Sequence, residues 1–467
     1  MNVPDQVKRN YLYQAGAQAV ALLTPLVATP YLARTLGPEG NGAYAYTFSV
    51  VSLFGLLIML GMVSYGSRSI ARVHPSSRSR AFGSLYALQA VRGLTVMALY
   101  GVFAGAFMQE YRALAWVQGL HLLAAMLDIS WLYAGVEDFK PVALRQTAVK
   151  LAGLLLTLLL VKEPAHLARY AAVIAGCMVL GQVWLWQGAG RYVRRERVTW
   201  QDVKPHIRPE LTLFVPVVAV NLYKMMDKVM LGGMSTMAQV GFYQQAEKIV
   251  SVPLGLVTAL GAVMLPRLSA MAARGDEKGS QRCIRQSLGW VMLLGSAFAF
   301  GLAAIAPVLA PVFLGRGYEP CAPLIMLQAA SMPFFCWANV IRTQVLIPRQ
   351  LDRAYVRSVL LGAVCNLAVN ALLIPGMQAA GAAIGTIVAE GVVCISQTVA
   401  VRRMLPVGRY LRETLPLLAA GGVMFLAVRC LMRLLPVGLW PLIGCIGAGA
   451  AVYMLLVWCL WRRRRCR

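Results

Sequence analysis

The sequence has little charge and few of the residues from which reactive sites are built. Charged residues make up 13% of its 467 residues and hydrophobic ones 59%, whereas a soluble chain carries about 25% charged residues. It has four His and no HExxH pattern, no CxxC pair and no Gly-rich loop ending in GK[ST]. These absences argue against a soluble enzyme, a zinc site and an ATP-driven pump. The ten Cys lie mostly singly in apolar stretches, so we expect reduced, buried thiols.

The sequence is rich in apolar runs of about 20 residues, each long enough to cross the ~30 Å hydrocarbon core of a bilayer. These runs predict an all-α polytopic membrane protein with about 14 transmembrane helices. The predicted spans are 11–34, 41–66, 81–108, 112–136, 142–161, 167–188, 211–234, 245–266, 286–314, 320–341, 355–375, 379–401, 413–435 and 438–461.

The distribution of basic residues predicts the orientation. If the N-terminus is cytoplasmic, the connections on that side and the adjoining ends of the spans hold 33 of the 44 Lys and Arg residues, and those on the opposite side hold 7. Lys and Arg accumulate in cytoplasmic loops, so both termini are predicted to be cytoplasmic. The same bias accounts for the net charge of +26, and no nucleic-acid partner is expected.

A weak internal repeat suggests how the spans are grouped. Shifting the chain by 199 residues aligns Tyr44 with Tyr243 and Arg68 with Arg267. Six spans separate the two copies, which predicts two six-helix lobes related as parallel repeats. The expected domains are an N-terminal lobe (1–188), a basic cytoplasmic linker (189–210), a C-terminal lobe (211–402), and two additional helices with a basic tail (403–467).

With the basic residues of the connections and the adjoining span ends set aside, we single out eight ionisable residues inside the predicted spans, where each costs roughly 2.5–3.5 kcal/mol unless it is paired or faces water. We interpret the four bases as a cationic substrate-binding path and the four acids as charge partners or ion-coupling groups. Structural ion pairing and, at the outer interface, snorkelling to headgroups remain as alternatives. No catalytic residue and no metal ligand is predicted. The bases are Arg92, Lys224, Lys228 and Lys248, and the acids are Asp128, Asp227, Glu247 and Glu390.

Two of these residues have more specific expectations. Asp227 is placed to pair with Lys224, three residues earlier on the same helix face. Arg92 lies near the middle of the third span with no other charge beside it in the sequence. We therefore expect Arg92 to be the best isolated cation.

Two segments, 31–73 and 222–271, resemble the polysaccharide-biosynthesis and O-antigen repeat-unit flippases of the multidrug/oligosaccharidyl-lipid/polysaccharide (MOP) exporter superfamily. The similarity rests on an A-R-x-L-G-P-x-G-x-G-x-Y turn and a D-[KR]-x-x-[IL]-G element, followed by G-x-Y, E-K and M-L-P-R. In this chain these are Ala33–Tyr44, Asp227–Gly232, Gly241 and Tyr243, Glu247 and Lys248, and Met264–Arg267.

This resemblance implies a bacterial inner-membrane carrier and not an enzyme. Such a carrier moves an undecaprenyl-diphosphate-linked oligosaccharide repeat unit, of O-antigen or exopolysaccharide, across the inner membrane by alternating access through a cationic central cavity. No cofactor is implied, and whether H⁺ or Na⁺ acts as a coupling ion is left open. The expected partners are the lipid-linked oligosaccharide and membrane lipids, with the polysaccharide polymerase and other assembly proteins as candidates.

Three alternatives stay open at this point. A cation-coupled multidrug exporter of the same superfamily would favour a carboxylate-dominated cavity and twelve spans, whereas here four bases balance four acids. A peptidoglycan lipid-precursor flippase would share the architecture and differ in the head group. A non-transporting scaffold of a polymer-assembly complex would keep its function when the buried charges are neutralised.

Overall fold

The structure is a computed structural model that describes residues 3–436 and 438–465, with the backbone alone described for 3–12, 15, 211–220, 222–224 and 463–465. All regular elements in the described part are helices. They are α1 (Val3–Met59), α2 (Met62–Arg72), η1 (Pro75–Ser77), α3 (Arg78–Phe107), α4 (Arg112–Gln118), α5 (Leu120–Met126), α6 (Ser130–Gly135), α7 (Lys140–Leu160), η2 (Pro164–His166), α8 (Leu167–Ala189), α9 (Trp200–Met234), α10 (Met237–Ala273), α11 (Glu277–Leu314), α12 (Cys321–Ile341), the π-helical turn η3 (Arg342–Leu346), α13 (Asp352–Val401), α14 (Val407–Leu434) and α15 (Leu439–Arg465).

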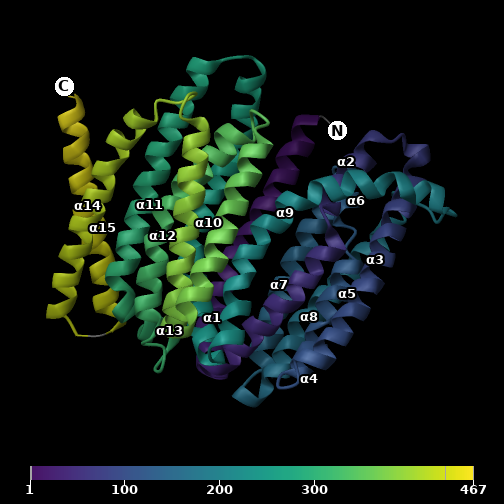
Figure 1. Ribbon diagram of the computed structural model, residues 1–467, viewed down its shortest axis with the longest axis horizontal. Helices are drawn as coiled ribbons and strands as arrows, with labels where there is room; N and C mark the ends of the chain where they lie inside the picture. The colour runs from purple at the N-terminus through teal and green to yellow at the C-terminus, as the bar shows by residue number, and fades with distance from the viewer. Residues whose placement is uncertain (1–2, 437, 466–467) are drawn as a thin grey trace. The chain divides into compact units, whose positions relative to one another are not determined.

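The helices form two compact units, Met1–Met225 and Met226–Arg467, and the division falls within α9. In the second unit, α10 to α13 run alongside one another as long helices, and α14 and α15 pack together (Figure 1).

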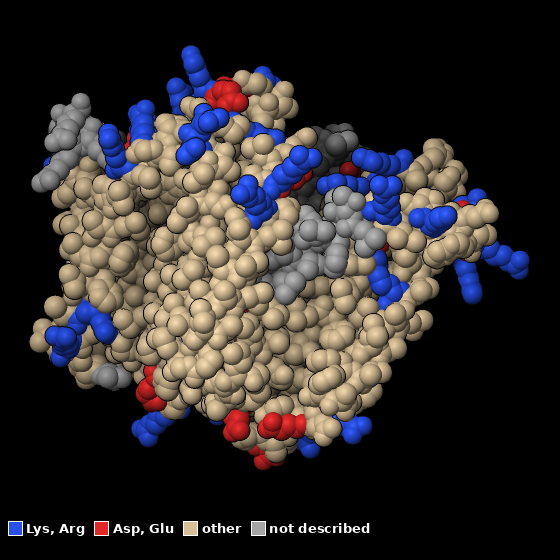
Figure 2. All heavy atoms as spheres, viewed as in Figure 1, with Lys and Arg blue, Asp and Glu red and all other residues tan. Residues whose placement is uncertain are grey.

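Eleven of the described helical segments are long and apolar enough to cross a membrane. Large apolar side chains point outward from them, with Val102 73% and Leu372 78% exposed. The face in Figure 2 is mostly uncharged, and its Lys and Arg residues lie mostly toward the margins. Because water would disfavour such a surface and lipid would not, the chain is a multi-pass membrane protein.

Two of the longest helices are interrupted. Gly37 in α1 has φ 69° and ψ 178°, and Gln378 in α13 has φ 50° and ψ −126°. Both breaks fall in connections predicted from the sequence, 35–40 and 376–378, which confirms these two turns. At the first break, the Asn41 side-chain amide donates to the carbonyls of Leu32 (2.9 Å) and Gly37 (2.7 Å). Backbone carbonyls freed by the break thus have a partner, as a membrane interior requires.

The core of the first unit depends on close helix contacts at glycine. A Cβ on Gly66 of α2 would lie 2.8 Å from the Trp131 ring of α6, and one on Gly135 of α6 would lie 2.6 Å from Ile70 of α2. The predicted span 112–136 corresponds to the three short helices α4, α5 and α6 in succession. This segmentation brings Trp131 into the core, where it is fully buried.

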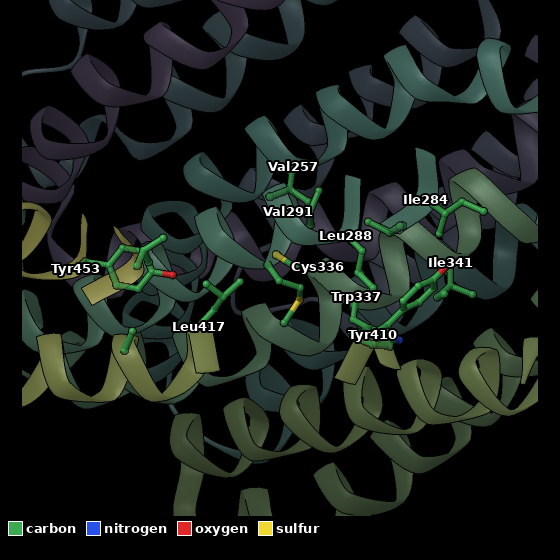
Figure 3. Packing of buried hydrophobic residues seen from close by; sticks show 14 of the residues in the cluster. Val257, Ile284, Leu288, Val291, Cys336, Trp337, Ile341, Tyr410, Leu417 and Tyr453 are labelled. Carbon is green, nitrogen blue, oxygen red and sulfur yellow. The ribbon is translucent and has the colours of Figure 1, made fainter. Parts of the chain in front are cut away.

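The core of the second unit is built around α11. Its buried apolar residues pack with those of α12, α14 and α15 (Figure 3). One polar link lies within this core, because the hydroxyls of Ser296 on α11 and Tyr453 on α15 are 2.6 Å apart. The C-terminal helix is therefore attached to the centre of the unit by packing and by a buried hydrogen bond.

Gly37→Ala is expected to destabilise the protein, because a residue with a Cβ in this positive-φ, extended-ψ conformation is strained by about 1–3 kcal/mol. A thermal melt of the purified protein in detergent should show a midpoint several degrees below that of the wild type. The matched control is Gly176→Ala, since Gly176 lies in regular helix with open space at its Cβ position. The expected control midpoint is equal to or above wild type, and equal midpoints for both variants would contradict the account of the break.

Candidate functional site

The two sequence elements centred on Asp227 and Glu247 face each other across α9 and α10. The Tyr243 hydroxyl donates a 2.7 Å hydrogen bond to Asp227 Oδ2. One turn further along, Lys228 Nζ donates to Glu247 Oε2 at 2.8 Å. Asp227 and Lys228 of α9 are thus paired with Tyr243 and Glu247 of α10, so the two sequence elements are in direct contact.

Asp227 is almost completely buried, with 3% of its surface exposed. Besides Tyr243, its carboxylate accepts from Asn370 Nδ2 (2.6 Å) and Thr386 Oγ1 (2.9 Å). Asn370 and Thr386 lie on opposite sides of the Gln378 break in α13. One carboxylate therefore holds together α9, α10 and both halves of α13.

The partners of Asp227 among the described side chains are neutral. The predicted pairing partner Lys224 falls among the residues whose side chains lie outside the described part of the chain. A buried carboxylate that is balanced only by neutral donors carries a large desolvation cost unless it takes up a proton or a cation. The described contacts of the Asp227 carboxylate thus supply hydrogen bonds and no positive charge.

The available donor atoms fit a hard cation as well as a proton. Oxygen atoms of Asp227 and Thr386 meet here, and Asn370 Oδ1 is buried with no hydrogen-bond partner in the described part of the structure. Ions that prefer oxygen ligands use this mixture of carboxylate, hydroxyl and amide oxygen. The same described residues contain no group of three or more His, Cys, Asp or Glu side chains that would bind a transition metal.

The Lys228–Glu247 pair is less enclosed than Asp227. The Lys228 side chain is 12% exposed and that of Glu247 36%. The following residue, Lys248, is half-buried and forms no ion pair with any described carboxylate. Two cations thus lie beside one partly exposed carboxylate.

Arg92 does not lie alone, contrary to the sequence-based expectation. Its guanidinium makes a bidentate ion pair with Glu210, at 2.8 and 2.9 Å, and its Nε donates to the Ile58 carbonyl at 2.9 Å. Glu210 is 1% exposed. Glu210 was assigned to the end of the polar linker 189–210, but α9 begins at Trp200 and carries it into the first unit. A long-range ion pair of this kind has no local sequence signal.

Glu210 belongs to a polar stripe on the first turns of α9. Asp202, His206 and Glu210 recur every fourth residue and therefore share one face of the helix. His206 lies 2.8 Å from the Tyr65 hydroxyl and 3.2 Å from that of Ser84. Asp202 lies 3.9 Å from a nitrogen of Arg80. The stripe attaches the start of α9 to α2 and α3.

The start of α9 is fixed by a capping interaction. The backbone amide and the hydroxyl of Thr199 donate to Asp202 at 2.9 and 2.8 Å, and these bonds lower the pKa of the Asp202 carboxyl. This T-x-x-D arrangement satisfies the amide of the residue that precedes the helix. The helix therefore begins inside the segment that the sequence suggested as a linker.

The two remaining acids are Asp128 and Glu390. Asp128 accepts a 2.8 Å hydrogen bond from the backbone amide of Ser130, the first residue of α6. Glu390 is buried in α13, with 7% of its surface exposed. The roles of all eight residues in substrate binding or ion coupling stay predictions.

Comparison with known proteins decides the family. The profile of the family described as "Polysaccharide biosynthesis protein" matches residues 7–272. The chain belongs to this family. A relative from Escherichia coli (strain K12), whose name ascribes O-antigen transport to it, is 23% identical over 396 residues. This alignment covers 82% of this chain and 94% of the relative.

Solved structures show that this polysaccharide biosynthesis protein has the fold of MOP-superfamily transporters. It is similar to the lipid II flippase MurJ in an inward closed conformation, with a TM-score of 0.78 and 13% identity over 98% of this chain and 99% of MurJ. An inward-facing multidrug resistance transporter of the MATE family has a TM-score of 0.62 and 15% identity, over 84% and 95% of the two chains. As a multi-pass member of this family, the protein is located in the bacterial inner membrane.

The neutral members of the Asp227 cluster, Asn370, Thr386 and Tyr243, are not among the site residues predicted from the sequence. A signal was present, since Asn366 and Asn370 are four residues apart in the apolar span 355–375 and so share a helix face. Asn370 Nδ2 lies 3.3 Å from Asn366 Oδ1. Two amides on one face of an apolar helix are therefore a sequence feature that indicates a polar cluster inside the membrane.

The Arg92–Glu210 pair of this polysaccharide biosynthesis protein gives a testable prediction. Arg92→Leu leaves Glu210 buried and uncompensated, which should cost about 3–5 kcal/mol. The double variant Arg92→Leu/Glu210→Leu removes both charges and should be more stable than Arg92→Leu alone. Thermal midpoints are measured for the wild type, Arg92→Leu, Glu210→Leu and the double variant, which together form a double-mutant cycle. Strictly additive effects would show that the pair is not coupled.

Proposed function

We propose that this protein moves an undecaprenyl-diphosphate-linked oligosaccharide repeat unit, of O-antigen or exopolysaccharide, from the cytoplasmic to the periplasmic face of the inner membrane. The observation that carries the proposal is the family match over residues 7–272, which contains the motif pairs Asp227–Tyr243 and Lys228–Glu247. The fold similarity to transporters supports carriage and not catalysis.

The proposed topology has fourteen spans and cytoplasmic termini. Eleven helical segments are long and apolar enough to span. Dividing α1 at Gly37 and α13 at Gln378 adds two spans, and the apolar second half of α9 adds one more. The excess of Lys and Arg in alternate connections supports the orientation.

The proposed substrate contact is made by cations at Lys228 and Lys248. The diphosphate of the substrate competes with Glu247 for Lys228, and Lys248 supplies a second positive charge next to it. Arg92 is already neutralised by Glu210, so its contribution requires that this pair open. Alternating access through a cationic cavity then carries the head group across.

The proposed coupling ion, H⁺ or Na⁺, binds at the Asp227 cluster. Its support is a buried carboxylate with neutral described partners and nearby amide and hydroxyl oxygens. Binding or release there changes the charge at the point where the halves of α13 meet, which couples the ion to a change of helix arrangement.

Flipping of a peptidoglycan lipid precursor is the second candidate, favoured by the similarity to MurJ over nearly the whole chain. The two functions differ in the sugars and share the lipid diphosphate. Complementation of two bacterial strains, one lacking its repeat-unit flippase and one depleted of its lipid II flippase, separates them. Restored surface polysaccharide in the first strain alone supports the proposal, whereas rescue of the second strain alone overturns it.

Lys228→Ala and Lys248→Ala should each reduce surface polysaccharide at least tenfold in the complemented repeat-unit strain and cause the lipid-linked intermediate to accumulate. The control is Lys278→Ala, which removes an exposed lysine at the start of α11 and should leave polysaccharide unchanged. Membrane levels of each variant are compared by immunoblot. Wild-type polysaccharide in both test variants would refute the cationic contact and favour a scaffold.

Two further variants test the coupling ion. Asp227→Asn removes the charge with little change in shape, and Gly385→Ala places a Cβ 2.0 Å from Asn370 Oδ1 in the same cluster. In proteoliposomes, both should abolish the acceleration of flipping by an imposed Na⁺ or proton gradient. Gly391→Ala, in open space on the same helix, should retain it. A full gradient response in Asp227→Asn would exclude this cluster as the ion site.

A further inference from the structure

A pocket of about 350 Å³ lies in the second unit, between one face each of α11 and α14 and the end of α15. Its α11 wall includes Arg282, Arg285, Gly289 and Leu293, which recur at helical spacing and therefore share a face. None of its lining residues belongs to the Asp227 cluster or to the Lys228–Glu247 pair. The pocket is thus separate from the proposed transport site.

The wall changes from charged to apolar along the axis of α11. Arg282 and Arg285 lie in the first turns, within the predicted cytoplasmic connection 267–285. Leu293 lies eleven residues beyond Arg282, about 16 Å along a helix that rises 1.5 Å per residue. A lipid at the bilayer surface has the same order, because its headgroup is followed by acyl chains.

The charge around the pocket is positive. Arg285 donates to both carboxylate oxygens of Glu413, at 2.7 and 2.5 Å, and Arg409 Nε donates to the same carboxylate at 3.2 Å. Arg282 is exposed and has no ion-pair partner in the part of the chain that the structure describes. Three arginines and one carboxylate leave a net charge of +2 here, which complements an anionic phosphate headgroup.

The mouth of the pocket presents aromatic surface and open space. Trp290 is 55% and Trp461 47% exposed, and their rings meet edge to face with centroids 6.1 Å apart. Trp side chains at this depth are typical of the membrane interface. A Cβ on Gly289, next to Trp290, would have no atom within 4 Å. The space is in the range, roughly 300–1,000 Å³, that accommodates small organic groups.

We propose that this pocket binds an anionic glycerophospholipid of the cytoplasmic leaflet. Its phosphate lies against Arg282 and Arg285, and the first part of its acyl chains lies against Leu293, Leu417 and the Trp461 ring. The remaining length of the chains extends into the bilayer. Bound there, the lipid connects α15 to α11 and α14 at their cytoplasmic ends.

Native mass spectrometry of the full-length protein in detergent tests this proposal. Phosphatidylglycerol, phosphatidylcholine and undecaprenyl diphosphate are titrated separately. For each lipid, the dissociation constant of the first molecule to bind is measured. Phosphatidylglycerol should bind at least tenfold more tightly than phosphatidylcholine. Arg282→Ala removes the exposed cation and should weaken phosphatidylglycerol binding about tenfold, as expected for one charge-assisted contact. Gly289→Leu fills the pocket without removing charge and should abolish the tight binding.

Two matched controls separate the pocket from general effects. Arg274→Ala removes an exposed arginine from the same predicted connection, and Gly422→Leu enlarges an α14 glycine whose Cβ position is also in open space. Both should bind phosphatidylglycerol as the wild type does. Equal affinity for phosphatidylglycerol and phosphatidylcholine, or wild-type binding in both pocket variants, would overturn the proposal. Tighter binding of undecaprenyl diphosphate that is lost in the pocket variants would overturn it in favour of a polyprenyl lipid.

Discussion

A charged side chain inside a membrane protein must be balanced, and the two units of this protein satisfy that requirement in different ways. In the first unit Glu210 is balanced by the guanidinium of Arg92. In the second unit the described partners of Asp227 are neutral donors, and they come from α10 and from both halves of α13. Helix positions in each unit depend on these contacts, because releasing any one of the helices would leave a polar group unsatisfied in an apolar surrounding.

The way in which each buried charge is balanced is relevant to function. A buried bidentate pair such as Arg92–Glu210 costs much to break and suits a fixed attachment, here of the first turns of α9 to α3. The Lys228–Glu247 pair is more exposed and next to another cation, so an incoming anion can replace the carboxylate at lower cost. Asp227 differs from both pairs, since its described partners are neutral hydrogen-bond donors. These differences support separate roles for residues that looked equivalent in the sequence.

Much of the fold could be predicted because it depends on local features. Apolar runs of sufficient length predict membrane helices wherever they occur, and Gly37 marked a turn that the structure confirms. The motif around Asp227 also indicated the candidate site. The ion pair of Arg92 could not be predicted, because Glu210 is 118 residues away in the sequence and lies in a segment with the polar composition of a linker.

The sequence by itself determined that the chain is helical, that it crosses a membrane many times, and which polar residues lie inside the apolar runs. Hydropathy and charge bias are sums over neighbouring residues, so they do not depend on how the chain folds back on itself. Only the tertiary structure decided which polar groups meet. Asn370 and Thr386 join Asp227 because α13 turns at Gln378 and packs near α9 and α10. A neutral amide or hydroxyl acquires its role from such proximity, because its effect on a carboxylate falls off beyond hydrogen-bond distance.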